Sequence, residues 1–190
     1  MSEEDASPER RPLLQRGIRA STTRSTAALW GKSLLNALLF FAIFMALLPW
    51  AAHWVLPLAV PVPEAARTVI AWLLFVAGVA GWVWGLDVFS RRGRGTPFPL
   101  DAPRHLATQG PFARTRNPIM GSELVVIWAV ALYFGSLGVF LYAGAMTVLS
   151  HWLVVHVEEP ELRQRFGASY DAYCERVPRW IPRTQPPPTS

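Results

Sequence analysis

The sequence has 190 residues, which is room for one domain. It is 52% hydrophobic and only 16% charged, whereas soluble domains carry about 25% charged residues. This composition excludes a disordered chain, a collagen and a coiled coil, and it argues against an ordinary soluble domain. The single cysteine, Cys174, excludes an intramolecular disulfide framework and a CxxC metal site. We therefore expect an integral membrane protein.

Long apolar stretches alternate with polar segments and predict about four membrane-spanning helices. Residues 1–32 are polar and rich in Arg, Ser and Thr, and they are expected to form a flexible basic tail. Crossing a bilayer takes about 20 apolar residues. Pro49 is expected to kink the first span. The predicted spans are residues 33–56, 67–90, 119–134 and 137–157.

The last two spans are separated only by Gly135 and Ser136, which predicts an antiparallel helical hairpin. After the hairpin, apolar and aromatic residues recur at helical spacing and predict short amphipathic helices on the membrane surface. Gly167 is expected to divide them. The fold class is thus an all-α integral membrane protein whose membrane domain covers residues 33–183, followed by a disordered tail at residues 184–190.

The basic residues predict the orientation of the spans. Cytoplasmic loops of membrane proteins carry an excess of Lys and Arg. With four spans, 17 of the 18 basic residues fall on one side of the membrane and only Arg67 falls on the other. Both termini are therefore expected in the cytoplasm, at a bacterial inner membrane. Since topology accounts for the charge, no nucleic-acid partner is expected.

Candidate functional residues gather in two cytoplasmic segments, residues 91–118 and 158–183. Because the hairpin returns the chain to the side that it left, the two segments should lie together and build any site jointly. The connections on the other side are too short to hold one. In the first segment, Gly110, Pro111 and Pro118 predict an irregular loop packed against a helix start.

Arg116 and Asn117 stand where the third span begins, and the free amides of a helix start favour an anion such as a carboxylate. The alternative is that Arg116 only marks the interface and that Asn117 only caps the helix. Two adjacent carboxylates, Glu158 and Glu159, follow the fourth span, where they are costly unless hydrated, paired or used. They could pair with Arg116 or hold a cationic ligand, and Glu158 is the better ligand candidate. Glu159 and Glu161 are expected to be hydrated.

Other polar residues give weaker signals. His151 and His156 are five residues apart, about 140° around a helix, so they form no two-histidine metal face and no metal site is expected. Asp87 is expected to pair with Arg91 at the i, i+4 spacing. Glu123 lies one turn into the third span, where it could face either the cytoplasmic cavity or the headgroups, and the sequence does not choose.

Two stretches together resemble the isoprenylcysteine carboxyl methyltransferase and phospholipid methyltransferase superfamily of membrane enzymes. The first is GTPFPLDAPRHLATQGPFARTRNP at residues 95–118, and the second is EEPELRQRFGASYDAYCERVPRWIP at residues 158–182. Their order, with a tight apolar hairpin between them, is also that of the superfamily. The resemblance covers roughly residues 70–182.

The resemblance implies an enzyme: a methyltransferase that uses S-adenosylmethionine and is not built on the soluble Rossmann fold. It implies a cofactor pocket formed by the loop before the hairpin and the segment after it. The chemistry of the residues agrees, because the cofactor has a carboxylate for Arg116 and an ammonium group for Glu158. No catalytic residue is assigned. The cofactor-binding residues carried over by motif are Arg104, His105, Leu106, Ala107, Gly110, Phe112, Arg116, Asn117, Pro118, Ile119 and Glu158.

The expected acceptor is a lipophilic or lipid-like molecule that reaches the cytoplasmic membrane face through the surrounding lipids. Met120 and Phe112 stand where relatives commonly have Tyr, and Val154 stands where the eukaryotic prenylcysteine enzymes have an Arg for the substrate carboxylate. Val154 argues against a prenylcysteine carboxylate. The three departures also support an alternative, a degenerate non-catalytic member acting as a membrane scaffold or partner-binding subunit. The sequence leaves the acceptor, the methylated atom and the oligomeric state open.

Overall fold

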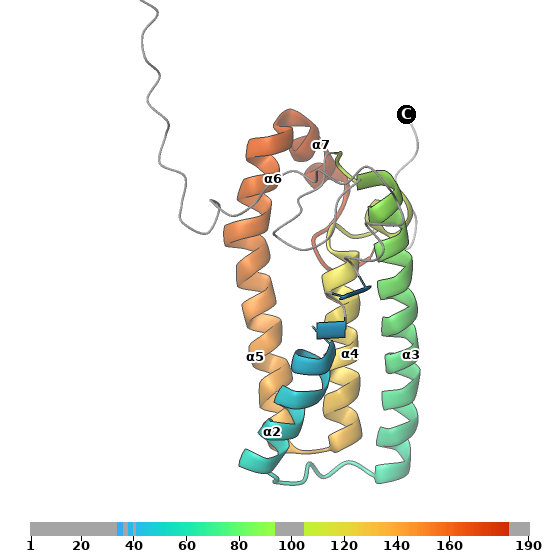
Figure 1. Cartoon of the computed structure of the whole chain (residues 1–190), viewed down its shortest axis with the longest axis vertical. Helices are drawn as coiled ribbons and strands as arrows, with labels where there is room; N and C mark the ends of the chain where they lie inside the picture. Colours follow the sequence, from blue (N-terminus) through green and yellow to red (C-terminus); the bar gives the residue numbers. More distant parts are fainter. Residues whose placement is uncertain (1–33, 36–37, 40, 94–104, 183–190) are drawn as a thin grey trace, which may run out of the picture.

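The described part of the chain is a bundle of helices packed side by side (Figure 1). The structure is a computed structural model that describes residues 34–35, 38–39, 41–93 and 105–182. Within these residues the chain forms helices and no strand, apart from one isolated bridge between Ala59 and Ser136. The all-α class is therefore confirmed. The two predicted tails lie outside the described residues.

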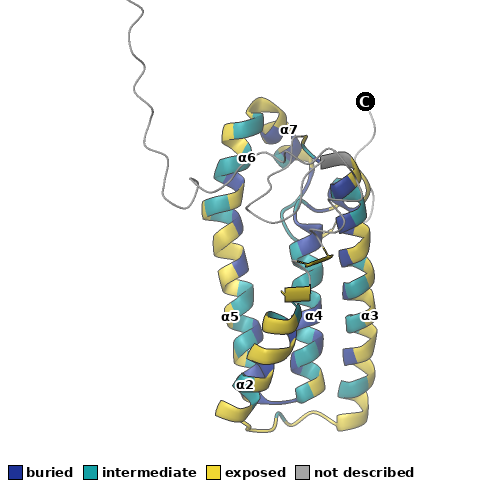
Figure 2. Ribbon diagram, viewed as in Figure 1, coloured by how far each residue is buried: buried dark blue, intermediate teal, exposed yellow. Residues whose placement is uncertain are grey.

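Two helices are long and apolar enough to cross a membrane. The first is α3 (Glu64–Val88), which runs on into the π-helical turn η3 (Phe89–Gly93). The second is a continuous rod from Leu137 to Phe166. Figure 2 shows that exposed residues lie on the outward faces of both, and large apolar side chains are among them. An apolar outer surface of this kind is what contact with lipid requires.

The rod consists of three helical segments, α5 (Leu137–Leu153), the π-helical turn η5 (Val154–Glu158) and α6 (Glu159–Phe166). It is longer than the predicted span of residues 137–157, because α6 continues the line of α5 past the π-helical turn (Figure 1). Gly167 then ends α6 with a φ of +51°, and α7 (Ala168–Arg176) follows in a new direction. The predicted division at Gly167 is confirmed.

The other two predicted spans are shorter helices, so the count of four spans stays a prediction. The first consists of the π-helix η2 (Phe41–Leu47) and α2 (Leu48–Val55). Pro49 cannot donate a backbone hydrogen bond, and the regular α-helical pattern fails in the turn before it. The helix type therefore changes next to Pro49, while the predicted kink stays a prediction.

The third predicted span is α4 (Pro118–Phe134), and α3 packs closely against it through glycines. A Cβ on Gly78 would lie 2.7 Å from Val126 Cγ2, and one on Gly85 would lie 2.8 Å from Ile119 Cγ1. Such small residues let two helix backbones approach where there is no water to drive them together. This close contact holds the start of α4 in place, and the candidate site lies beside it.

The predicted hairpin between α4 and α5 is confirmed. Gly135 ends α4 in the left-handed region with a φ of 59°, and its amide donates to the carbonyl of Ala131. A Cβ at this position would also collide with the guanidinium group of Arg67. The positive φ favours glycine at this position, and a larger residue would also have to displace the Arg67 guanidinium group.

We predict that Gly135→Ala lowers the free energy of unfolding by more than about 1 kcal/mol, since alanine is strained at positive φ. Thermal unfolding of the detergent-purified protein measures the effect. The matched control is Gly144→Ala in α5, where a Cβ would meet nothing within 4 Å and stability should be unchanged or slightly higher. Equal destabilisation by both changes would contradict this account of the hairpin.

Candidate functional site

The two segments that the sequence predicts to lie together do so. The backbone N–H of Arg116 donates to the carbonyl of Pro178 at 2.9 Å. The Asn117 amide Nδ2 donates to the carbonyl of Arg179 at 3.1 Å, and Thr115 Oγ1 donates to the same carbonyl at 3.0 Å. The loop before α4 is therefore fastened along the C-terminal segment. Asn117 does occupy the N-cap position of α4, and its carbonyl accepts from the Gly121 amide, but its side chain makes no capping bond and is used for the contact with Arg179.

The loop also packs against α3 and α7. Its short 3-10 helix η4 (Gly110–Ala113) begins at Gly110, which has a φ of 60°. The Phe112 side chain is buried in a cluster with Trp82, and the Phe112 carbonyl accepts a hydrogen bond of 2.7 Å from Tyr173 Oη. These contacts confirm the irregular loop that the glycine and prolines predict, and they fix its position relative to α7.

A buried carboxylate, Glu159, lies where these segments meet. Only 2% of Glu159 is exposed, and both of its oxygens accept from Arg179, Oε1 from Nε at 2.6 Å and Oε2 from Nη2 at 3.0 Å. Arg116 Nη1 lies 3.1 Å from Oε1, and Arg163 Nη1 lies 3.9 Å from Oε2. The prediction that Glu159 is hydrated is wrong, because the C-terminal segment folds over it and supplies Arg179.

The charges around Glu159 keep it ionised. Glu159 lies beyond the predicted span that ends at residue 157. Burial alone would raise its pKa, but the hydrogen bonds from Arg179 and the positive charges of Arg116 and Arg163 outweigh burial and hold the pKa below its usual value. A carboxylate held in this way joins α6, the loop and the C-terminal segment through charge-assisted hydrogen bonds.

Arg116 is largely occupied by this cluster. Its side chain is 11% exposed, and its Nη1 also donates to Cys174 Sγ at 2.7 Å. The sequence-based suggestion that this pair of glutamates could bind Arg116 is therefore confirmed for Glu159, which is its carboxylate partner. One donor is left over: Arg116 Nε is buried and meets no acceptor in the described residues.

Glu158 differs from the adjacent Glu159 in both its exposure and its ion pairing. It is exposed, and no arginine or lysine pairs with it in the described ranges. It lies close enough to Glu123 and to Tyr173 for its charge to act on both. An unpaired carboxylate at the end of an apolar helix, facing side chains of α4 and α7, is the strongest candidate for binding a cation.

Glu123 is the polar residue whose place the sequence left open. Its Oε1 accepts a hydrogen bond of 3.0 Å from Trp82 Nε1, so the side chain points from α4 toward α3, inside the bundle. The Glu123 side chain therefore faces the interior of the bundle, close enough to Glu158 for the charges to interact. The available signal was a lone carboxylate in an apolar span, which by itself marks a functional candidate.

The other predicted residues fall into two groups. Ala107, Asn117, Pro118 and Ile119 are buried, and Leu106 packs partly buried against Tyr170 and Tyr173. His105 and Gly110 are exposed. Arg104 lies outside the described residues. The structure therefore brings the described part of the predicted set to one end of the bundle, and its role in binding a cofactor stays a prediction.

The remaining polar predictions concern local contacts. Arg91 Nε lies 2.7 Å from Asp87 Oδ1, which confirms the predicted pair. His151 Nδ1 accepts from Trp180 Nε1 at 3.0 Å, and the ring of His156 stacks on that of Trp152 with 5.2 Å between centroids. Both histidines are thus engaged with tryptophans at this end of the bundle.

An all-helical bundle with two helices of membrane length, and with arginines and carboxylates gathered at one end, defines a membrane protein that has a polar site at one of its ends. The chain matches the phospholipid methyltransferase family over residues 66–169, which is more than half of its length, and it belongs to that family. No curated protein matches the chain significantly.

The family match begins at α3 and ends at the start of α7, so it includes the loop, the hairpin and Glu158. Membership implies a membrane methyltransferase domain that uses S-adenosylmethionine and acts on phospholipid-like acceptors. The superfamily that the two sequence stretches resemble is thereby confirmed.

We predict that Glu159→Gln lowers the free energy of unfolding by about 3 kcal/mol, because it leaves Arg116 and Arg179 without their carboxylate. Denaturant or thermal unfolding in detergent measures the loss. The control is Glu161→Gln, which removes only a partly exposed pair with Arg165 and should cost less than about 1 kcal/mol. A variant as stable as the wild type would show that Glu159 does not hold the segments together.

We also predict that stability is sensitive to acid. Since the pKa of Glu159 is lowered in the folded protein, its contribution is complete above the ordinary glutamate pKa of about 4.3 and is lost as the pH falls through the folded value. Below about pH 4.3, the melting temperature of the wild type should therefore fall more steeply than that of Glu159→Gln. Parallel melting curves across this range would refute the assignment.

Proposed function

We propose that this chain transfers a methyl group from S-adenosylmethionine to a lipophilic or lipid-like acceptor at the cytoplasmic face of a bacterial inner membrane. The observation that carries the proposal is the unpaired carboxylate of Glu158, at the same end of the bundle as the unpartnered Arg116 Nε, in a chain of the phospholipid methyltransferase family. The high density of arginines at this end supports the cytoplasmic orientation, with both termini on that side.

The residues at this end suit the amino-acid head of the cofactor. Glu158 has no cationic partner in the described chain and can accept the ammonium group. Arg116 Nε is a buried donor without an acceptor, and a carboxylate is the group that it fits best. S-adenosylmethionine supplies a methyl group on a positively charged sulfur. The exposed loop residues His105 and Gly110 are proposed to cover the part of S-adenosylmethionine that lies beyond its amino-acid head.

The protein's part in such a reaction is to align the two reactants and to exclude water, because direct displacement of a sulfonium group needs little other help. The loop is well suited to this, since Thr115, Asn117 and the Phe112 carbonyl are all hydrogen-bonded to the C-terminal part of the chain. A loop fixed in this way would hold a bound cofactor in one orientation relative to the acceptor. We assign no general base.

The acceptor is proposed to arrive from the side, between helices. Glu123 lies deeper in the bundle than Glu158. It would be the first polar side chain to contact the polar head of an acceptor that enters between the helices. Val154, one turn before Glu158, is fully buried. A buried valine offers no cation to a substrate carboxylate at that position, which supports an acceptor other than prenylcysteine.

We predict that Glu158→Gln weakens S-adenosylmethionine binding about 10- to 100-fold, the effect of losing one charge-assisted hydrogen bond. Isothermal titration of the detergent-purified protein, with the cofactor and with its demethylated product, measures this. Glu161→Gln is the matched control and should bind as the wild type does, because its carboxylate is paired with Arg165.

The outcome separates the two functional hypotheses. Binding by the wild type that is unchanged in Glu158→Gln would refute the site. No binding by folded wild type, in lipid as well as in detergent, would refute the enzyme and favour the scaffold alternative suggested by Met120, Phe112 and Val154. Purified phosphatidylethanolamine in vesicles is the first acceptor to test for methyl transfer once binding is established.

A further inference from the structure

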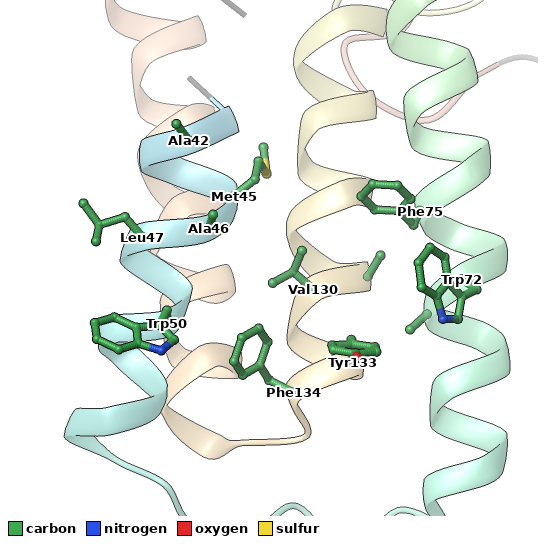
Figure 3. A pocket seen from close by; sticks show the side chains of 12 residues that line it. Ala42, Met45, Ala46, Leu47, Trp50, Trp72, Phe75, Val130, Tyr133 and Phe134 are labelled. Carbon is green, nitrogen blue, oxygen red and sulfur yellow. The ribbon is translucent and has the colours of Figure 1, made fainter. Parts of the chain in front are cut away.

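A large apolar cleft opens between helices at the end of the bundle opposite the candidate site. Its volume is about 700 Å³, within the range of about 300–1,000 Å³ that small-molecule sites occupy. Figure 3 shows it between the helix formed by η2 and α2 and helix α3, with side chains of α4 completing its lining. None of the lining residues is charged. They are Ala42, Met45, Ala46, Leu47, Trp50, Ala71, Trp72, Phe75, Ala129, Val130, Tyr133 and Phe134.

Aromatic side chains surround the wide lower part of the cleft. Trp50, Trp72 and Tyr133 are each more than half exposed, and Figure 3 shows the rings of Trp50 and Tyr133 near the last turn of α4, with Trp72 above them. Tryptophan and tyrosine concentrate where a membrane's hydrocarbon core meets its headgroups. The cleft therefore extends from the headgroup level into the hydrocarbon region.

Two opposite charges lie at the mouth of the cleft. Arg67 precedes the lining residue Ala71 by one helical turn and shares its side of α3. The guanidinium Nη1 donates to the carbonyl of Leu132 at 2.8 Å and also to the carbonyl of Tyr133, which holds it beside the cleft. Glu64, the first residue of α3, lies one turn further out. The described chain provides no ion-pair partner for either residue.

We propose that the cleft holds an acyl chain of one zwitterionic phospholipid from the membrane leaflet at this end. The phosphate would bind Arg67 and the positively charged headgroup amine would bind Glu64, while the hydrocarbon fills the space between α2 and α3. The order of charges along α3 matches that of the lipid, since the phosphate lies nearer to the acyl chains than the amine does. This lipid is bound and not methylated, because the candidate site is at the other end of the bundle.

The cleft fits a lipid better than the other available occupants. Water would find almost no hydrogen-bond partners among these side chains, and a cleft of this size left empty would forfeit packing along its whole length. A second copy of the chain would have to insert a ridge between two helices. An acyl chain needs only to enter sideways from the surrounding membrane, and the Arg67 and Glu64 charges select its headgroup.

Native mass spectrometry tests this proposal on the full chain, extracted from vesicles made of equal parts phosphatidylethanolamine and phosphatidylglycerol. We expect one retained phosphatidylethanolamine per protein. Ala46→Phe fills the cleft from an exposed position and should reduce retention about tenfold. The matched control is Leu48→Phe, an exposed position on the same helix outside the cleft, which should retain lipid as the wild type does.

The headgroup is tested separately. Glu64→Gln should lower the preference for phosphatidylethanolamine over phosphatidylglycerol without reducing total retention, because the phosphate contact remains. Ala42→Phe provides a second cleft-filling variant should Ala46→Phe unfold.

Several results would overturn the proposal. These are equal lipid retention by the two cleft-filling variants and the wild type, a preference for phosphatidylglycerol, or a lipid-free dimer that Ala46→Phe dissociates. The last would assign the cleft to a second copy. None of these readouts involves S-adenosylmethionine, so the result is independent of the proposed enzymatic function.

Discussion

The end of the bundle that carries the candidate site depends on one buried carboxylate. Glu159 is held by arginines from three different segments: Arg116 from the loop before α4, Arg163 from α6 and Arg179 from the C-terminal segment. An ionic contact of this kind contributes little net stability compared with a hydrophobic one, but it specifies strongly which groups must meet.

The ion cluster also explains why two adjacent glutamates behave so differently. Successive residues of a helix point about 100° apart, so with Glu159 turned into the arginines, Glu158 is turned out of them. The buried residue is thereby used for structure, and the exposed one is available for chemistry. Arg116 can serve both the structural and the ligand-binding role. Its Nη1 contacts Glu159, while its buried Nε has no acceptor in the described chain.

Much of the fold could be predicted from the sequence because it depends on local patterns. The two-residue turn formed by Gly135 and Ser136 between two apolar segments defines the hairpin. Gly167 separates the last two helices, α6 and α7. The site was less predictable. Glu159 looks like a hydrated helix-end charge until Arg179, 20 residues away, folds over it. Likewise, the inward direction of Glu123 depends on Trp82 from another helix. Contacts between distant segments leave no periodic signal in one sequence.

The rod from Leu137 to Phe166 links the hairpin turn rigidly to the candidate site. With 30 residues it is about 45 Å long, whereas a hydrocarbon core is only about 30 Å thick. A rigid helix accommodates a thinner or thicker bilayer by changing its tilt. Glu158 lies far along this rod, while the loop that faces it is fastened at the start of α4. Because Arg116 and Arg179 tie the loop and the C-terminal segment to Glu159 on this rod, a change of tilt is expected to move the two halves of the site together.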